Sequence, residues 1–227
     1  MFAELIAWLT DPAHWRGSDG IPAQTLLHLY YCVVSVAAAS VLAIPLGVWI
    51  GHTGRGGVLV VGVSNALRAL PTLGLVTLLV LGFGLGEVPA LAGLVVLAVP
   101  AILSGAHAGI RNAPPDAVDA ARGMGMTPRQ RLWQVELPTA LPLILGGVRS
   151  AMLQVVATAA VAAYVGLGGL GRILLDGLKV SDYAQMASAA IAIAVLAVLL
   201  DLVLAGVTRL LVPRGLTTAA RQGGSRG

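Results

Sequence analysis

Long runs of apolar residues, separated by short polar stretches, occupy most of this chain. Five of these runs are long enough to cross a bilayer, because a membrane-spanning helix needs about 20 mostly apolar residues. They cover residues 23–50, 57–81, 88–110, 141–165 and 183–211. The pattern predicts an all-α, polytopic membrane protein with about five transmembrane helices. Since five is odd, the two ends of the chain are expected on opposite sides of the membrane.

The composition agrees with this class. Of the 227 residues, 57% are hydrophobic and 11% are charged, whereas a soluble domain carries about 25% charged residues. The formal net charge of +4 could favour nucleic-acid binding, but the arginines alternate with apolar spans. We therefore interpret them as orientation signals and expect no nucleic-acid partner. The single cysteine, Cys32, rules out an internal disulfide.

Basic residues predict the orientation. If the C-terminus is cytoplasmic, the loops 51–56 and 111–140 and the stretch from Arg209 onward place nine arginines on that side. The other side then holds three basic residues, which are Arg16, Arg172 and Lys179. This imbalance follows the positive-inside rule. We expect the N-terminus outside and the C-terminus in the cytoplasm.

The chain divides accordingly into three parts. Residues 1–22 are expected to be an extracytoplasmic segment, residues 23–211 the transmembrane domain, and residues 212–227 a cytoplasmic basic tail. The first segment carries Glu4 and Asp11 where a cleavable signal would be basic. With its two tryptophans it is expected to lie at the membrane interface, and packing against a partner is the alternative.

Small residues and prolines punctuate the spans. Two pairs of glycines stand four residues apart, a spacing that allows close helix contact in lipid; they are Gly47 with Gly51 and Gly105 with Gly109. Each of the first three spans also contains a proline, which interrupts the backbone hydrogen bonding; these are Pro45, Pro71 and Pro100. Static packing with kinks and movable helices around a pathway both fit this pattern.

The longest polar stretch, residues 111–140, has the signals of two short, capped helices. In the first, the Pro114-Pro115 pair suits an initial turn, and Asp116 and Asp119 lie where the helix dipole favours anions. Gly123 and Gly125 are predicted to end it.

The second helix is predicted to start at Thr127 as N-cap, with Pro128 in the first position and Gln130 completing a capping box. Pro138 is predicted to end this helix. Each cap contributes about 1 kcal/mol. The loop is therefore expected to be rigid, and a rigid loop can transmit force.

A specific spacing lies within this loop: Asp119-Ala120-Ala121, then Gly125, Val135 and Leu137-Pro138. It resembles the EAA motif of ABC importer permeases, in which Glu-Ala-Ala precedes Gly, Ile and Leu-Pro at the same intervals. Asp for Glu and Val for Ile are conservative departures. The resemblance implies the type I importer permease architecture and a first short helix that docks on an ATPase subunit. It assigns coupling to Asp116, Asp119, Ala120, Ala121, Gly123, Gly125, Leu137 and Pro138.

Further stretches resemble permeases for quaternary-amine osmoprotectants (glycine betaine, carnitine, choline or proline). They are residues 27–29, 44–47, 65–73 and the glycine-rich 164–171. Arg68 departs from that pattern, since an uncharged polar residue such as glutamine is expected there. Permeases for methionine share the architecture and are the alternative.

Three ionisable residues lie inside the predicted spans: Arg68, Arg149 and Asp201. Each costs about 2.5–3.5 kcal/mol to insert, so each is expected to face protein or water and to have a partner. All three lie roughly 12–17 Å from the cytoplasmic ends of their spans, so they could share a layer. We expect Asp201 to pair with Arg149 or, failing that, with Arg68. A static pair, a pair that lines or gates the pathway, and arginines that snorkel remain open, and Pro71 joins the pathway candidates.

The sequence contains no nucleophile elbow, phosphate-binding loop or paired-carboxylate motif. We expect no enzyme activity, no cofactor and no metal in this chain, and ATP and Mg²⁺ would be bound by a partner ATPase. Aromatic residues make up only 4%, too few for an aromatic cage that captures a quaternary ammonium. An external binding protein would then recognise the substrate.

The resemblance therefore implies a permease subunit of the inner membrane. Its expected partners are an ABC ATPase dimer, a second permease copy or a paralogue, an extracytoplasmic substrate-binding protein and membrane lipid. One copy is too small to enclose a path, so two would form it about a two-fold axis. A secondary transporter or channel without an ATPase is the runner-up, although such proteins usually contain inverted repeats and we find none in the sequence. A membrane enzyme is the third reading.

Overall fold

The computed structural model describes residues 2–212, so the predicted basic tail lies outside the described residues apart from Val212. All regular secondary structure in residues 2–212 is helical. The long helices are α2 (Ile21–Thr53), α5 (Glu87–Arg111), α8 (Leu137–Ala162) and α10 (Tyr183–Leu211). The shorter elements are α1 (Phe2–Thr10), η1 (Pro12–Trp15), α3 (Gly57–Ala69), α4 (Thr72–Phe83), α6 (Pro115–Gly123), α7 (Pro128–Arg131), η2 (Leu132–Glu136), η3 (Ala163–Val165) and α9 (Leu170–Val180).

Four stretches of the described chain are long and apolar enough to cross a membrane: α2, α5, residues 128–165 and α10. The pair α3 and α4 makes a fifth only if it counts as one broken span, because its two helices meet at 89°. The expected second span, residues 57–81, is therefore a bent pair of helices, with the break at Pro71, the proline that was predicted to interrupt it. The break falls at Leu70 and Pro71, which both have extended backbone. Proline disfavours helical backbone in the residue before it and supplies no N–H to continue the helix.

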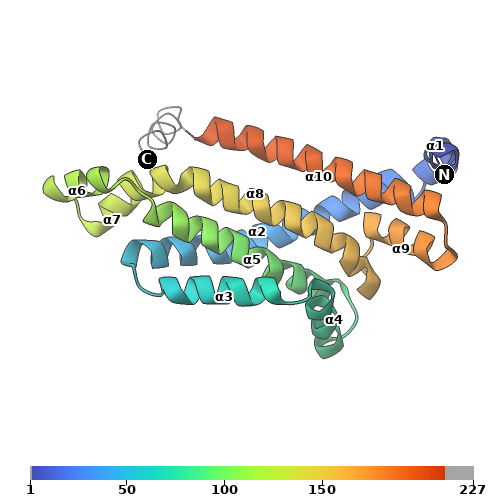
Figure 1. Cartoon of the computed structure of the whole chain (residues 1–227), viewed down its shortest axis with the longest axis horizontal. Helices are drawn as coiled ribbons and strands as arrows, with labels where there is room; N and C mark the ends of the chain where they lie inside the picture. The colour runs from blue at the N-terminus through green and yellow to red at the C-terminus, as the bar shows by residue number, and fades with distance from the viewer. Residues whose placement is uncertain (1, 213–227) are drawn as a thin grey trace.

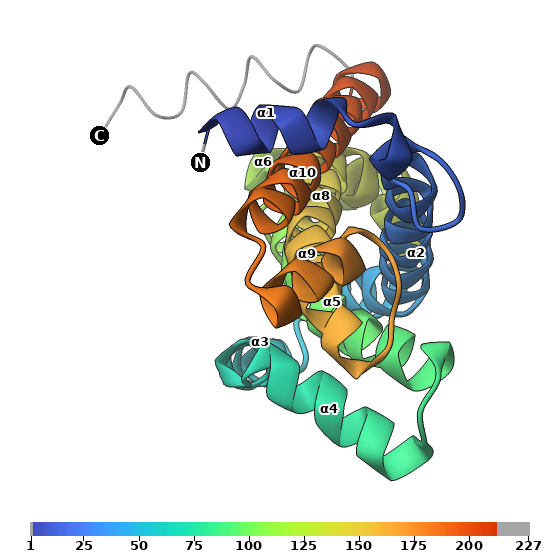
Figure 2. The same ribbon diagram turned by 90° about the vertical axis from the view of Figure 1, so that its right-hand side faces the viewer.

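The other two interrupting prolines behave differently. Pro45 lies inside the continuous helix α2 and Pro100 inside α5. Both helices are packed on several sides, and neighbouring helices can support a span at a proline. The bent pair α3–α4 lies instead at the edge of the bundle (Figures 1 and 2).

Helices α2, α5 and α8 run side by side and form the core of the molecule (Figure 1). Glycines set their separation. A Cβ on Gly47 would lie 2.7 Å from the Cβ of Ala106, and a Cβ on Gly105 would lie 2.7 Å from the carbonyl oxygen of Leu143. Both are closer than real Cβ contacts, so the predicted glycine pairs do bring these helices into backbone contact.

The polar elements gather at the two ends of the bundle. Figure 1 shows α6 and α7 at one end, near the last turn of α10, and α1 and α9 at the other. Helix α10 lies along the outside and buries only Ser188, Ala189 and Leu196. It is attached to the bundle mainly through α9 and α8.

We predict that replacing Gly147 by alanine destabilises the protein by about 1–3 kcal/mol through overpacking. The added methyl would lie 2.8 Å from the carbonyl oxygen of Ala101 on α5. The neighbouring Gly146 is the matched control, because an added Cβ there has no atom of another described helix within 4 Å. Gly146→Ala should be neutral or stabilising, since alanine favours helix over glycine by about 1 kcal/mol. Apparent melting temperatures in detergent measure both, and equal values for the two variants would contradict the packing.

Candidate functional site

The first helix of the polar loop, α6, forms as predicted. It begins with Pro115 in the first turn and Asp116 beside it. Gly123 is its last residue, and Gly125 follows with φ +77°, a left-handed conformation that glycine adopts without strain. The N–H of Met126 reaches back to the carbonyl of Ala121 over 3.1 Å. The turn after α6 is thus closed by backbone hydrogen bonds.

The second helix begins as predicted but does not end where predicted. Thr127 and Gln130 form a capping box: the N–H of Gln130 donates to Oγ1 of Thr127 over 3.3 Å, and the N–H of Thr127 donates to Oε1 of Gln130 over 2.8 Å. However, α7 continues through the π-helical turn η2 into α8, and Pro138 is the second residue of α8.

The wide turn explains why Pro138 does not stop the helix. A proline removes one backbone hydrogen bond and collides with the carbonyl four residues earlier. The π-helical turn immediately before it changes that spacing, as π-bulges do within α-helices. The polar loop therefore ends in a helix that is continuous with the fourth span, with no break between them.

The residues of the motif divide into an exposed and a buried group. Five are exposed at the end of the bundle: Asp116, Asp119, Ala120, Gly123 and Gly125. Ala121 is 1% exposed and anchors α6. Leu137 and Pro138 are half-buried at the start of α8, where Leu137 packs against a cluster of buried residues from α5 and α8. Met124, in the turn directly after α6, and Trp133, which lines an apolar pocket with residues of α2, are large exposed apolar side chains that the motif does not include.

A buried ionic cluster lies behind α6, and the sequence reading missed it. Glu136 is 5% exposed. Its Oε1 accepts a hydrogen bond from Nε of Arg131 over 2.7 Å, and its Oε2 accepts one from Nδ1 of His52 over 2.5 Å. The cluster lines a polar cavity of about 330 Å³ together with Arg111, Asp119 and Arg122. A glutamate inside the otherwise apolar stretch 135–137 was the available signal.

The charges inside the spans pair as expected in one case. Nη2 of Arg149 donates to Oδ2 of Asp201 over 2.6 Å, and Nε of Arg149 donates to Oδ1. This fork joins α8 to α10. Arg68 is exposed at the end of α3, two residues before the break, and makes no ion pair with any other described residue. The alternative pairing of Asp201 with Arg68 is therefore not observed.

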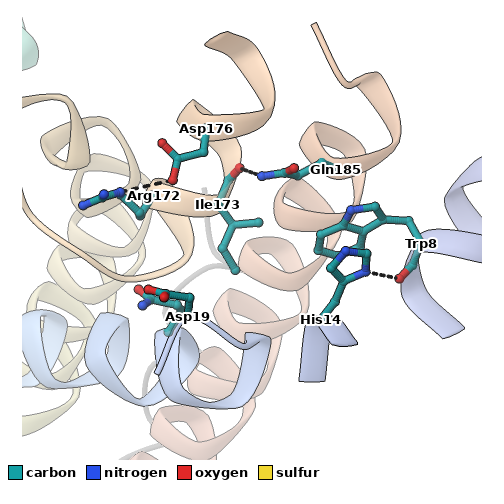
Figure 3. Close-up of a pocket in the computed structure, with 8 residues that line it drawn as sticks. Trp8, His14, Asp19, Arg172, Ile173, Asp176 and Gln185 are labelled. Carbon is teal, nitrogen blue, oxygen red and sulfur yellow. Dashed lines mark hydrogen bonds and ion pairs between the residues drawn. The ribbon is translucent and has the colours of Figure 1, made fainter. Parts of the chain in front are cut away.

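The opposite end of the bundle holds a polar pocket of about 300 Å³ between the N-terminal segment, α9 and α10. Figure 3 shows Trp8 stacked on His14, with ring centroids 4.0 Å apart, and Asp176 beside Arg172 at 3.1 Å. Hydrogen bonds from Lys179 and then from Arg172 hold the pKa of Asp176 below its ordinary value. His14 and Asp176 therefore already have hydrogen-bond partners within the chain.

The glycine-rich turn near this pocket packs directly on α2. Its Gly169 has φ +84° and donates its N–H to Oε1 of Gln24 over 2.6 Å. A Cβ there would lie 3.1 Å from His28, which leaves little room for a larger residue. In residues 2–212, no group of three or more His, Cys, Asp or Glu side chains is placed to hold a metal ion.

Comparison with known proteins identifies the class. Residues 43–215 match the family described as binding-protein-dependent transport system inner membrane component. The match covers well over half of the chain, so the chain belongs to this family. It is an inner-membrane transport component of ABC importers, and the family description implies that it works with an ATPase and with a binding protein. The expected resemblance to ABC importer permeases is confirmed.

Individual relatives agree with this family assignment. The chain is 34% identical over 218 residues to the osmoprotectant import permease protein OsmW of Salmonella typhimurium, covering 94% of this chain and 99% of that one. It is 31% identical to the choline transport system permease protein OpuBB of Bacillus subtilis, covering 85% and 89%. A chain of the inward-facing MetNI methionine ABC transporter superposes with a TM-score of 0.76 at 24% identity, covering 85% and 96%. The last likeness concerns the fold and confirms the importer permease architecture.

We predict that Arg149→Ala and Asp201→Ala each lower the apparent melting temperature of the protein, because each leaves a charge without its partner inside a membrane span. Exchanging the residues, Arg149→Asp with Asp201→Arg, should recover most of the loss. Arg172→Ala is the control, since its ion pair with Asp176 lies on an exposed helix and contributes less than about 1 kcal/mol. Apparent melting temperatures in detergent report the four variants, and an exchange that recovers nothing would contradict the pairing.

Proposed function

We propose that this chain is the membrane-spanning permease subunit of an importer for small osmoprotectants of the quaternary-amine type, driven by a separate ATPase. One observation carries the coupling role: α6 lies at the tip of the bundle and is joined by a short hydrogen-bonded turn to α7, which leads through η2 into α8 without a break. The substrate class rests on relatives that are named for osmoprotectants and for choline.

In this proposal the ATPase subunit grips the exposed residues of α6. They present Asp116 and Asp119 in the first two turns and the small residues Ala120, Gly123 and Gly125 at the end. Small residues allow another protein to approach the backbone closely. Leu137 and Pro138 act at the base, where the helix enters the bundle. ATP and Mg²⁺ belong to the ATPase, and this chain needs no cofactor of its own.

The proposed orientation puts α6 in the cytoplasm and the N-terminal segment outside. It is supported by the distribution of basic residues and by the separation of these elements to opposite ends of the bundle (Figure 1). The binding protein would then dock near α1 and α9. A second copy or a paralogue would complete the translocation pathway, and the large apolar side chains exposed on α3 and α4, such as Leu59 and Leu78, offer surface for it or for lipid.

Transport would follow from movement of the helices. When the ATPases close, they displace α6. The turn after α6 passes this displacement to α7, and the continuous helix from α7 through η2 to α8 carries it into the bundle. The fork between Arg149 and Asp201 makes α10 follow α8. Arg68 and Pro71 lie at the break between α3 and α4, where a broken span can line a cavity. We propose this break as the part of the chain that lies nearest the pathway.

We predict that Gly125→Arg and Ala120→Glu each reduce binding of the ATPase at least about tenfold, as expected when a contact at the centre of an interface is lost. The measurement is ATPase activity recovered with the tagged chain from solubilised native membranes. Gly17→Arg is the matched control, because Gly17 also has positive φ (+80°) and open surroundings but lies at the other end of the bundle. Equal recovery with Gly125→Arg and Gly17→Arg would reject α6 as the docking helix.

We predict that proteoliposomes containing the complete importer take up radiolabelled glycine betaine or choline only when ATP and the binding protein are present. Unlabelled methionine should not compete. Uptake of methionine instead would move the chain to a different substrate class. Uptake driven by an ion gradient without the ATPase would favour the secondary transporter and contradict the proposal.

A further inference from the structure

Glu136 is a charged residue whose side chain is largely shielded from solvent. The exposed fraction of its side chain is 7%, and those of Arg131 and His52 are 14% and 15%. Both carboxylate oxygens are used, one by each neighbour. A buried carboxylate is strongly disfavoured unless its oxygens accept hydrogen bonds. The position of Glu136 is therefore fixed by two separate parts of the chain.

The π-helical turn makes one of these bonds feasible. Arg131 and Glu136 are five residues apart, and in an α-helix such residues point about 140° away from each other. In the π-helical turn, hydrogen bonds join residues five apart, so these two side chains lie one above the other. The same widened turn lets the helix continue past Pro138. Two features of this segment thus have one geometric cause.

The second bond reaches a different helix. His52 lies in the last turn of α2, just before the cap residue Gly54. Within residues 2–212, its bond to Glu136 is the only side-chain hydrogen bond between α2 and residues 112–136. Beneath it, Val48 of α2 and Leu132 pack against a buried apolar cluster of α5 and α8. The ionic cluster therefore lies where the polar loop meets the end of α2.

The segment from the start of α6 to the end of α8 is called the lever. We propose that Glu136 is a positioning residue that joins the end of α2 to this lever, so that displacement of α6 moves α2 together with α8. The inference rests on the proposed coupling role of α6. The bond from Arg131 holds the π-helical turn in shape, and the bond from His52 carries its movement to α2. Without the carboxylate, the lever still docks on the ATPase but slides past α2. Hydrolysis then proceeds with less transport.

The test compares uptake with hydrolysis in proteoliposomes that contain the complete importer. Two variants are used: Glu136→Gln, which keeps the size of the side chain and removes its charge, and His52→Gln, which leaves the Arg131–Glu136 pair intact. Arg129→Gln is the matched control, because Arg129 is an exposed arginine on the same short helix and makes no ion pair with any other described residue. The probe is radiolabelled glycine betaine or choline, whichever the unaltered importer takes up.

Substrate imported per ATP hydrolysed should fall at least about fivefold in both variants, as expected for the loss of coupling between two sites. The amount of ATPase bound and its hydrolysis rate should stay within about twofold, and the control should match the unaltered protein. If uptake and hydrolysis fall by the same factor, or neither changes, the positioning role is overturned. Should Glu136→Gln fail to assemble, His52→Gln alone decides by the same ratio. An unaltered chain that binds no ATPase would instead overturn the proposed function, and the inference with it.

Discussion

The close approach of three helices at glycine positions is the constraint on which the structure depends. In lipid, apolar side chains gain little by leaving the solvent, so helices associate through van der Waals contact and polar bonds. Gly47 and Gly51 bring α2 against α5, while Gly105 and Gly147 bring α5 against α8. These contacts leave almost no free space between backbones. The three helices consequently form one block, and the remaining elements attach to its sides and ends.

Polar side chains then determine how those elements attach. Three long-range connections use this principle: Arg149 with Asp201 joins α10 to α8, Glu136 with His52 joins η2 to α2, and Gln24 with Gly169 holds the glycine-rich turn on α2. An unpaired polar group is disfavoured in apolar surroundings, so each connection fixes one relative position of its two elements. Only 11% of the residues are charged, so few other polar contacts are available to fix the positions of these elements.

Several features could be predicted because their causes are local. The fifth span was predicted at the bounds observed for α10, and the capping box at Thr127 follows from three neighbouring residues. The Arg149–Asp201 pair follows from depth, because two charges at similar height in adjacent spans have few other partners. In each case the relative position of the residues is set either by their closeness in the sequence or by the depth of their spans in the membrane.

The features that could not be predicted depend on neighbours in space. Three prolines gave the same signal in the sequence, yet Pro45 and Pro100 lie within continuous helices and only Pro71 breaks its span. Pro138 is accommodated by a π-helical turn that no local pattern indicated. His52 and Glu136 are 84 residues apart, and their contact requires the packing of α2 against α8. Charge at position 136 was visible in the sequence, but its partner was not.

In the proposed mechanism, these two kinds of feature together allow a small membrane subunit to receive a push at one end. A lever must be stiff along its length and attached at defined points. The continuous helix from Pro128 to Val165 supplies the stiffness. The glycine contacts hold it against α5 along one face, and the two ionic connections attach α2 and α10 to it near different heights. Since backbone-to-backbone packing resists separation more than sliding, small shifts of α8 along α5 are the movement that this arrangement permits most readily. In the proposed mechanism the polar connections decide which helices share that shift, and the bent pair α3–α4, which has no such connection to α8 among the described hydrogen bonds, would stay in place as α8 moves.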